Sequence, residues 1–347
     1  MPLPEQISTG FRERPAPHAA GVHARVPGRI SPVLNIRVIA PAHLCDAARA
    51  LVDDDPTVAD VVQLAGTADN GLLLFDVARE NANAVLAGLR ALGIERSGSI
   101  TLTEPLTTIS DAAHAAEAHA PGHPDDALVW EQIEDQARDS SRWSWSFIGF
   151  LLLATLIASV GRYTDQPILI VGAMVVGPEF APISAVCIAL VRGRLSLIPR
   201  AFGTLLGGFL LACALTWMLW AIAYALGWID FTKATTGELT EFIVAPDIWS
   251  FLIALLAGCA GVLSLTSSKS AALVGVFISV TTVPAVATLG LTLAVGAWAE
   301  TWSAFVQLAV NVAGLLIAGT ATLLAQRLAW HRFGRLPKAM ITPRSAA

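Results

Sequence analysis

Long apolar runs separated by short polar segments fill the chain from about Ser144 to Gln326. A helix needs about 20 apolar residues to cross the roughly 30 Å hydrocarbon core of a bilayer. Six runs approach or exceed this length, and we predict that each forms a membrane span: Ser144–Gly161, Pro167–Val191, Ala201–Ile229, Ile248–Ser268, Ser270–Ala299 and Thr301–Gln326. The pattern therefore predicts an α-helical multi-span protein whose membrane domain covers residues 143–330.

Residues 31–107 instead show the shorter periods of a small α+β domain. Strands are predicted at Val33–Pro41, Val58–Leu64, Leu72–Ala78 and Ser99–Leu106, and helices at Ala42–Asp54 and Glu80–Leu92. The order β-α-β-β-α-β predicts a ferredoxin-like domain. Because a fold does not fix a function, this domain is either a scaffold for oligomerisation or a ligand-sensing module, and the sequence names no ligand.

Three polar segments complete the domain organisation. Residues 1–30 are rich in Pro, His and Arg and lack the apolar core of a signal peptide, so we predict a disordered tail. Residues 108–142 are predicted to form a linker and then a polar helix, and residues 331–347 a cytoplasmic tail. The linker carries His114, His119 and His123, but spacings of five and four residues do not align them on one helical face. We therefore expect no metal site and no cofactor.

Charges in the loops predict the orientation. Basic residues follow the second and sixth runs: Arg192, Arg194, Arg200, Arg327, Arg332, Arg335 and Lys338. The loop after the third run is acidic, with Asp230, Glu238 and Glu241. Because loops rich in Lys and Arg stay on the cytoplasmic side, we expect a bacterial inner-membrane protein with both termini in the cytoplasm. Arg162 is the exception to this pattern.

The two halves of the apolar region share an order of features. Trp145-Ser146-Phe147 opens the first run and Trp249-Ser250-Phe251 opens the fourth. Each half then has a glycine about 25 residues later and a proline about ten residues beyond it, namely Gly172 with Pro182 and Gly275 with Pro284. An odd number of spans in each half places the halves in opposite orientations, so the sequence predicts the inverted repeat typical of secondary transporters.

Two of the predicted spans are interrupted. Pro178 and Pro182 flank Glu179 near the centre of the second run, and a regular helix cannot continue through both prolines. Glu179 is the only acidic residue within the six runs, and an ionisable group at such a depth usually has a function. It either binds a cation, a proton or a polar substrate, or it only stabilises the helix break. The candidate pathway residues are Gly177, Pro178, Glu179, Pro182, Ser184, Thr281, Thr282, Pro284, Gln307 and Asn311.

Several segments resemble a known family. They are Leu153–Gly161, Ile170–Pro178, Ala181-Pro182-Ile183 and Val280–Gly290. They resemble a bacterial and archaeal family of uncharacterised membrane proteins that carry domain of unknown function 389. The resemblance implies a multi-span protein with an optional soluble domain, and it implies no biochemical activity.

The leading hypothesis is a transporter or channel-like permease for a small solute or ion, regulated by the cytoplasmic domain. The alternative is a membrane-anchored sensor or scaffold that transports nothing. The predicted spans contain no His or Asp and no catalytic pair, so we do not expect an enzyme. The expected partners are the lipid bilayer, a small solute or ion, and further copies of the chain in a homo-oligomer, but no nucleic acid.

Overall fold

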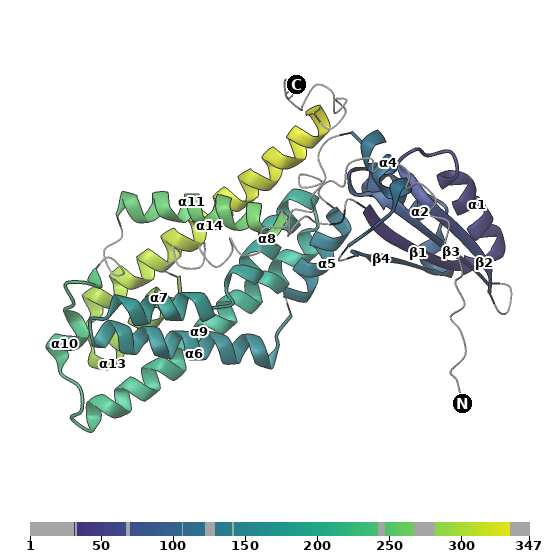
Figure 1. Cartoon of the computed structure of the whole chain (residues 1–347). Helices are drawn as coiled ribbons and strands as arrows, with labels where there is room; N and C mark the ends of the chain where they lie inside the picture. Colours follow the sequence, from purple (N-terminus) through teal and green to yellow (C-terminus); the bar gives the residue numbers. More distant parts are fainter. Residues whose placement is uncertain are drawn as a thin grey trace, which may run out of the picture.

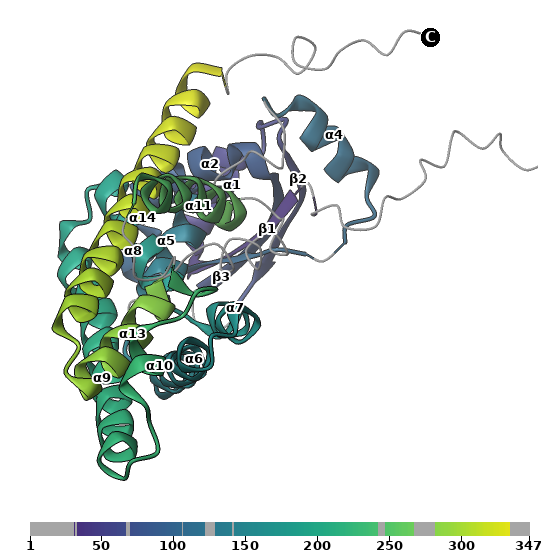
Figure 2. The same ribbon diagram turned by 90° about the vertical axis from the view of Figure 1, so that its left-hand side faces the viewer.

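The computed structural model describes residues 31, 33–66, 70–105, 107–121, 129–140, 142–241, 247–266 and 282–333. A sheet with its helices forms one end of the molecule, and a group of long helices forms the rest (Figure 1). Figure 2 shows the same two regions from the side, with α14 running along the helical region.

Four strands form one antiparallel sheet: β1 (Val33–Pro41), β2 (Val58–Ala65), β3 (Asn70–Ala78) and β4 (Ser99–Thr103). They lie in the order β2-β3-β1-β4, so the two central strands are β1 and β3. Alternate side chains of β1 point into the core, and Leu34, Ile36 and Val38 are fully buried. This alternation is the pattern from which the strand was predicted.

The helices α1 (Ala42–Val52) and α2 (Ala82–Ala91) complete the order β-α-β-β-α-β. The second begins later than predicted, because Arg79–Asn81 forms a 3-10 turn, η1. It ends before Gly93, whose φ of 76° is the left-handed conformation that glycine adopts without strain. A further short helix that we did not predict, α3 (Ile94–Ser97), leads into β4.

Part of the predicted linker is a helix, α4 (Asp111–His119). Its N-cap is Ser110, whose hydroxyl accepts a hydrogen bond of 3.2 Å from the backbone N–H of Ala113. The helix packs against β2 and β3, which buries Ala113 and Ala116. His123 lies outside the described residues, and among those described no three metal-binding side chains come together.

Four described helices are long and apolar enough to cross a membrane. They are α6 (Trp145–Tyr163), α9 (Ile198–Ala225, extended by the 3-10 turn η3, Leu195–Leu197), α11 (Ile248–Thr266) and α14 (Trp298–Phe333). A fifth span is formed if α7 (Pro167–Val176) and α8 (Phe180–Arg192), which are bent by 52°, count as one broken helix. Exposed apolar side chains on these helices, such as Leu210 and Leu256, are typical of surfaces that contact lipid.

The predicted fifth span is the least complete. Its helix α13 (Thr282–Val295) has 14 residues, which is about 21 Å of helix and less than the roughly 30 Å needed. Residues 267–281, which include Thr281, lie outside the described residues. The structure therefore supports four or five spans, and the predicted six go beyond it. The helix α13 is nevertheless central, because it packs against α6, α9 and α14 and nearly all of its side chains are buried.

Two short helices join the larger parts. The polar helix α5 (Trp130–Ser140) precedes the first apolar helix and packs against α8. The helix α10 (Phe231–Thr235) follows α9 and contacts α6 and α13 at the opposite end of the helical region (Figure 1). Both helices carry polar contacts that are part of the sites described next.

Candidate pathway at the broken helix

The helix break lies where the prolines predicted it. The helix α7 ends at Val176, and its C-cap residue Gly177 donates a backbone hydrogen bond of 3.1 Å to the carbonyl of Ala173. Pro178 cannot donate the next backbone hydrogen bond, and the chain resumes as a helix only at Phe180. Glu179 is the N-cap residue of α8 and therefore sits at the bend itself.

Glu179 is buried with only 4% of its surface exposed. Its Oε1 accepts a hydrogen bond of 2.8 Å from the hydroxyl of Thr282, at the start of α13. Its Oε2 has no hydrogen-bond partner among the described residues. A carboxyl group with one unsatisfied oxygen in an apolar interior is energetically costly, so its retention calls for an explanation.

Gly177 makes room for this carboxyl group. A Cβ atom at position 177 would clash with Oε2 of Glu179 and would come within 2.9 Å of a methyl group of Val283. Any larger residue at 177 must therefore displace the carboxyl group from its position beside Thr282. The predicted residues Gly177, Pro178, Glu179 and Thr282 are thus brought together in space.

Two apolar residues, Phe180 and Val283, are buried next to the residues of the break. Phe180 is buried, and its ring fills the position that a Cβ of Gly261 on α11 would occupy. Val283 of α13 is fully buried. The carboxyl group therefore lies at the end of α7 beside the start of α13, and its burial strengthens electrostatic interactions there because water is scarce.

The remaining predicted residues are buried on the helices around the break. On α8, Pro182 and Ser184 are both buried, and the Ser184 hydroxyl donates a 2.8 Å hydrogen bond to the carbonyl of Ala181. Pro284 is buried on α13. Gln307 and Asn311 lie four residues apart on the buried side of α14, which packs against α8 and α13. The described hydrogen bond to the Glu179 side chain comes from Thr282.

Sequence reasoning missed a second polar cluster at the far end of α6. Arg162 is 2% exposed, and it donates hydrogen bonds to the hydroxyl of Thr240 at 2.9 Å and to the carbonyl of Thr235 at 3.2 Å. Thr240 in turn donates to Asp165 at 2.8 Å, and the N–H of Leu239 donates to the same carboxyl group at 3.2 Å. These contacts fasten the loop after α10 onto the end of α6.

Asp165 accepts these hydrogen bonds through its carboxylate, and its surroundings favour the ionised form. Desolvation raises its pKa, but the hydrogen bonds from Thr240 and Leu239 and the charge of Arg162 outweigh this effect and hold the pKa below its ordinary value of 3.8. A cavity of about 520 Å³ adjoins the cluster and is lined in part by Glu238, Glu241 and Glu300. Arg162 is therefore a buried cation with hydrogen-bond partners. Its position is accounted for by these local contacts, so it need not follow the predicted distribution of basic residues in the loops.

The polar helix α5 connects the two domains. Toward the sheet domain, Glu131 pairs with Arg90 at 2.7 Å, and the N–H of Trp130 donates to Asn83 at 3.2 Å. Val129, just before α5, belongs to the apolar core of the sheet domain. The helix therefore begins as part of that domain.

Toward the apolar helices, α5 contacts the second half of the broken helix. Glu134 is buried and forms an ion pair with Arg192 at the end of α8, and Arg194 lies 3.6 Å away. The guanidinium group of Arg192 also lies 5.3 Å from the ring centre of Trp130. Ile133 of α5 shares an apolar cluster with residues of α8. The helix α5 thus contacts both the sheet domain and α8, whose N-cap residue is Glu179.

The chain thus combines a small α+β domain with apolar helices that are long enough to span a membrane, next to a helix pair broken around a buried acid. Residues 174–317 match the family model described as Domain of unknown function (DUF389). This part of the chain is thus similar to that family, in agreement with the resemblance predicted from the sequence.

A relative of the chain is also uncharacterised. The chain is 24% identical over 240 residues to a Methanocaldococcus jannaschii protein named Uncharacterized protein MJ0678, and the match covers 69% of this chain and 71% of the relative. No solved structure matches the chain. The comparisons therefore relate the chain to this family and name no activity.

Proposed function

We propose that the chain is a transporter or channel-like permease for a small solute or ion, and that Glu179 is its coupling group. The observation that carries this proposal is the hydrogen bond between Glu179 and Thr282 at the helix break. It joins the second and fifth predicted spans, which occupy equivalent positions in the two proposed three-span units. Transporters built from inverted repeats bind their ions and substrates where such discontinuous helices meet.

The proposal includes six spans, an inverted repeat and cytoplasmic termini in a bacterial inner membrane. In this arrangement the midplane site opens to each side in turn as one unit rocks against the other. Glu179 exchanges a proton or cation during this movement, and its second carboxylate oxygen, which has no described partner, supplies the acceptor. The Thr282 hydroxyl holds the carboxyl group while the site is closed.

Regulation by the sheet domain forms part of the same proposal. The helix α5 supports it, because this helix contacts the sheet domain through Glu131 and the broken helix through Glu134. A ligand or partner of the sheet domain would shift the position of α8 and so change the rate of transport.

The test is a flux measurement on the full chain in proteoliposomes. Radioactive sodium and rubidium are the probes for ions, and a pH-sensitive dye inside the vesicles reports protons under an imposed membrane potential. We expect flux of at least one of these ions above that of protein-free vesicles. The Glu179→Gln variant should lose the pH dependence of this flux, whereas the exposed Asp139→Asn variant, with the same loss of charge, should retain it.

A scaffold or sensor without transport is the second candidate. The observation that favours it is the near-complete burial of Glu179. Glu179 lines neither the cavity beside Arg162 nor the cavity between Arg142 and Arg200, so neither cavity gives a solute access to it. In this case the apolar helices would assemble copies of the chain, and the sheet domain would bind a ligand or partner. Vesicles containing the protein would then show no flux of any probe above protein-free vesicles.

A further inference from the structure

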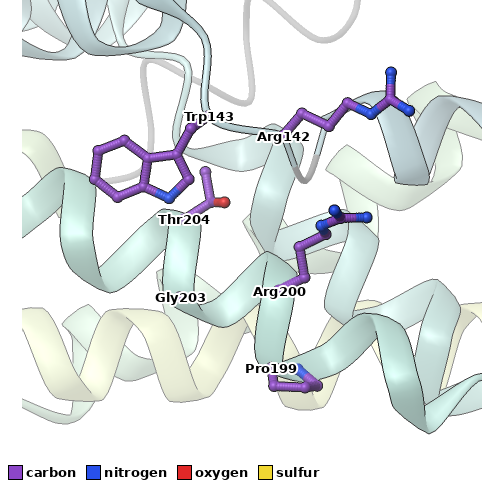
Figure 3. A pocket seen from close by; sticks show the side chains of 6 residues that line it. All are labelled: Arg142, Trp143, Pro199, Arg200, Gly203 and Thr204. Atoms are coloured by element: carbon purple, nitrogen blue, oxygen red, sulfur yellow. The ribbon is translucent and has the colours of Figure 1, made fainter.

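A cavity of about 580 Å³ lies where α5 passes into the first apolar helix and where α9 begins. Six residues line it: Arg142, Trp143, Pro199, Arg200, Gly203 and Thr204. In the view of Figure 3 the guanidinium groups of Arg142 and Arg200 lie to one side of Trp143. The cavity therefore combines two cations with an aromatic ring.

The charges of these two arginines are not neutralised within the described structure. Arg200 is exposed and has no hydrogen-bond or ion-pair partner among the described residues. Arg142 approaches Asp139 at 3.7 Å, but both side chains are more than two thirds exposed, so this pair contributes little. Both guanidinium groups are thus available to an anion from outside the chain.

Neighbouring arginines at the same end of the helices are already engaged. Arg192 pairs with the buried Glu134, and Arg327 donates a 2.6 Å hydrogen bond to the carbonyl of Val191 at the end of α8. Arg192 and Arg327 therefore connect helices, whereas Arg142 and Arg200 face the cavity. Arg194 lies 3.6 Å from Glu134 and does not line the cavity, whereas Arg142 and Arg200 both line it.

The cavity opens onto an apolar surface. Leu206 and Leu210 lie three and seven residues beyond Gly203, which places them on the same face of α9, and they are 48% and 63% exposed. Trp143 packs on this helix as well, because a Cβ at Gly207 would lie 2.5 Å from its ring. Tryptophan is enriched at the level of lipid headgroups, with its ring across the boundary between apolar and polar layers.

We propose that this cavity binds the phosphate group of an anionic membrane lipid. Arg142 and Arg200 hold the phosphate through charge-assisted hydrogen bonds, Trp143 lies at headgroup level, and an acyl chain follows Leu206 and Leu210 along α9. The proposal rests on membrane insertion of α9 and not on transport, because a scaffold with the same helices would bind the same lipid.

The test is native mass spectrometry of the purified full chain titrated with phosphatidylglycerol, and with phosphatidylcholine of the same acyl chains as the zwitterionic control. We expect the anionic lipid to bind preferentially. Each basic side chain near the membrane surface contributes about fivefold in affinity, so Arg200→Gln should weaken binding about fivefold and Arg142→Gln with Arg200→Gln about 30-fold. Arg200→Lys, which retains the charge, should lose less than Arg200→Gln.

The matched control is Arg96→Gln, an exposed arginine of the sheet domain whose loss removes the same charge. Its affinity for phosphatidylglycerol should equal that of the unaltered chain. Unchanged binding by the double variant, or equal binding of the two lipids, would overturn the proposal. Displacement of the lipid by inorganic phosphate at matched concentration would also overturn it, because the site would then be one for the free anion.

Discussion

Thr282 donates a 2.8 Å hydrogen bond to Glu179 across a sequence separation of 103 residues. The bond connects the break between α7 and α8 to the start of the described part of α13. The second carboxylate oxygen of Glu179 has no hydrogen-bond partner among the described residues. The proposed coupling of a proton or cation therefore depends on this contact.

Gly177→Ala should displace the Glu179 carboxyl group, because the added methyl group occupies the position of Oε2. We expect the hydrogen bond from Thr282 to be lost, at a cost of about 1 kcal/mol in the free energy of unfolding. The measurement is thermal unfolding of the purified protein in detergent. Gly172→Ala is the matched control, since a Cβ there meets no atom within 4 Å, and equal melting temperatures for the two variants would contradict the geometry.

Thr282→Val should have a related effect without changing the shape of the core. The substitution removes the hydroxyl and leaves both carboxylate oxygens of Glu179 without a described partner. We expect a loss of about 1–3 kcal/mol in the free energy of unfolding, the usual cost of an unsatisfied buried polar group. Thr282→Ser, which keeps the hydroxyl, should lose less; a larger loss for Ser than for Val would contradict the role of the hydrogen bond.

The loop contact at Asp165 should loosen in acid. The pKa of Asp165 is lower in the folded protein than its ordinary 3.8, so its stabilising effect is complete above that value and disappears as the pH falls through the folded pKa. We expect hydrogen exchange at the amide of Leu239, corrected for the intrinsic pH dependence, to increase in that range. In Asp165→Asn the amide should exchange faster at neutral pH and show no such acid transition.

Glu134→Gln should weaken the connection between α5 and α8. It removes the charge that pairs with Arg192 and Arg194, and breaking one side of a largely buried pair typically costs about 3–5 kcal/mol locally. We expect faster hydrogen exchange in residues 130–140 with little change in the sheet. The exposed Asp139→Asn on the same helix is the control, and equal exchange in both variants would show that Glu134 does not hold α5 in place.

Local features could be predicted from the sequence because their causes are local. The alternation of β1, the prolines at 178 and 182, and the apolar runs each determine structure within a few residues. The helix α4 was missed because its Ala- and His-rich sequence has no clear apolar face, and packing against the sheet stabilises it.

The contacts of the candidate sites could not be predicted in the same way. Glu179 was found because an acid in an apolar run is conspicuous, but its partner depends on how distant helices pack. Likewise Arg162 bonds to Thr240, which is 78 residues away in the sequence, and Glu134 pairs with Arg192, which is 58 residues away. The sequence around one residue of such a pair does not indicate which distant residue will be its partner.

The central claim is that Glu179 couples the movement of a proton or cation to transport through the broken helix. The most direct measurement compares ion flux in proteoliposomes at several pH values for the unaltered chain, Glu179→Gln and Glu179→Asp. We predict that flux by the unaltered chain depends on pH, that Glu179→Gln abolishes this dependence, and that Glu179→Asp retains it at a reduced rate. Flux through Glu179→Gln with an unchanged pH dependence would contradict the claim.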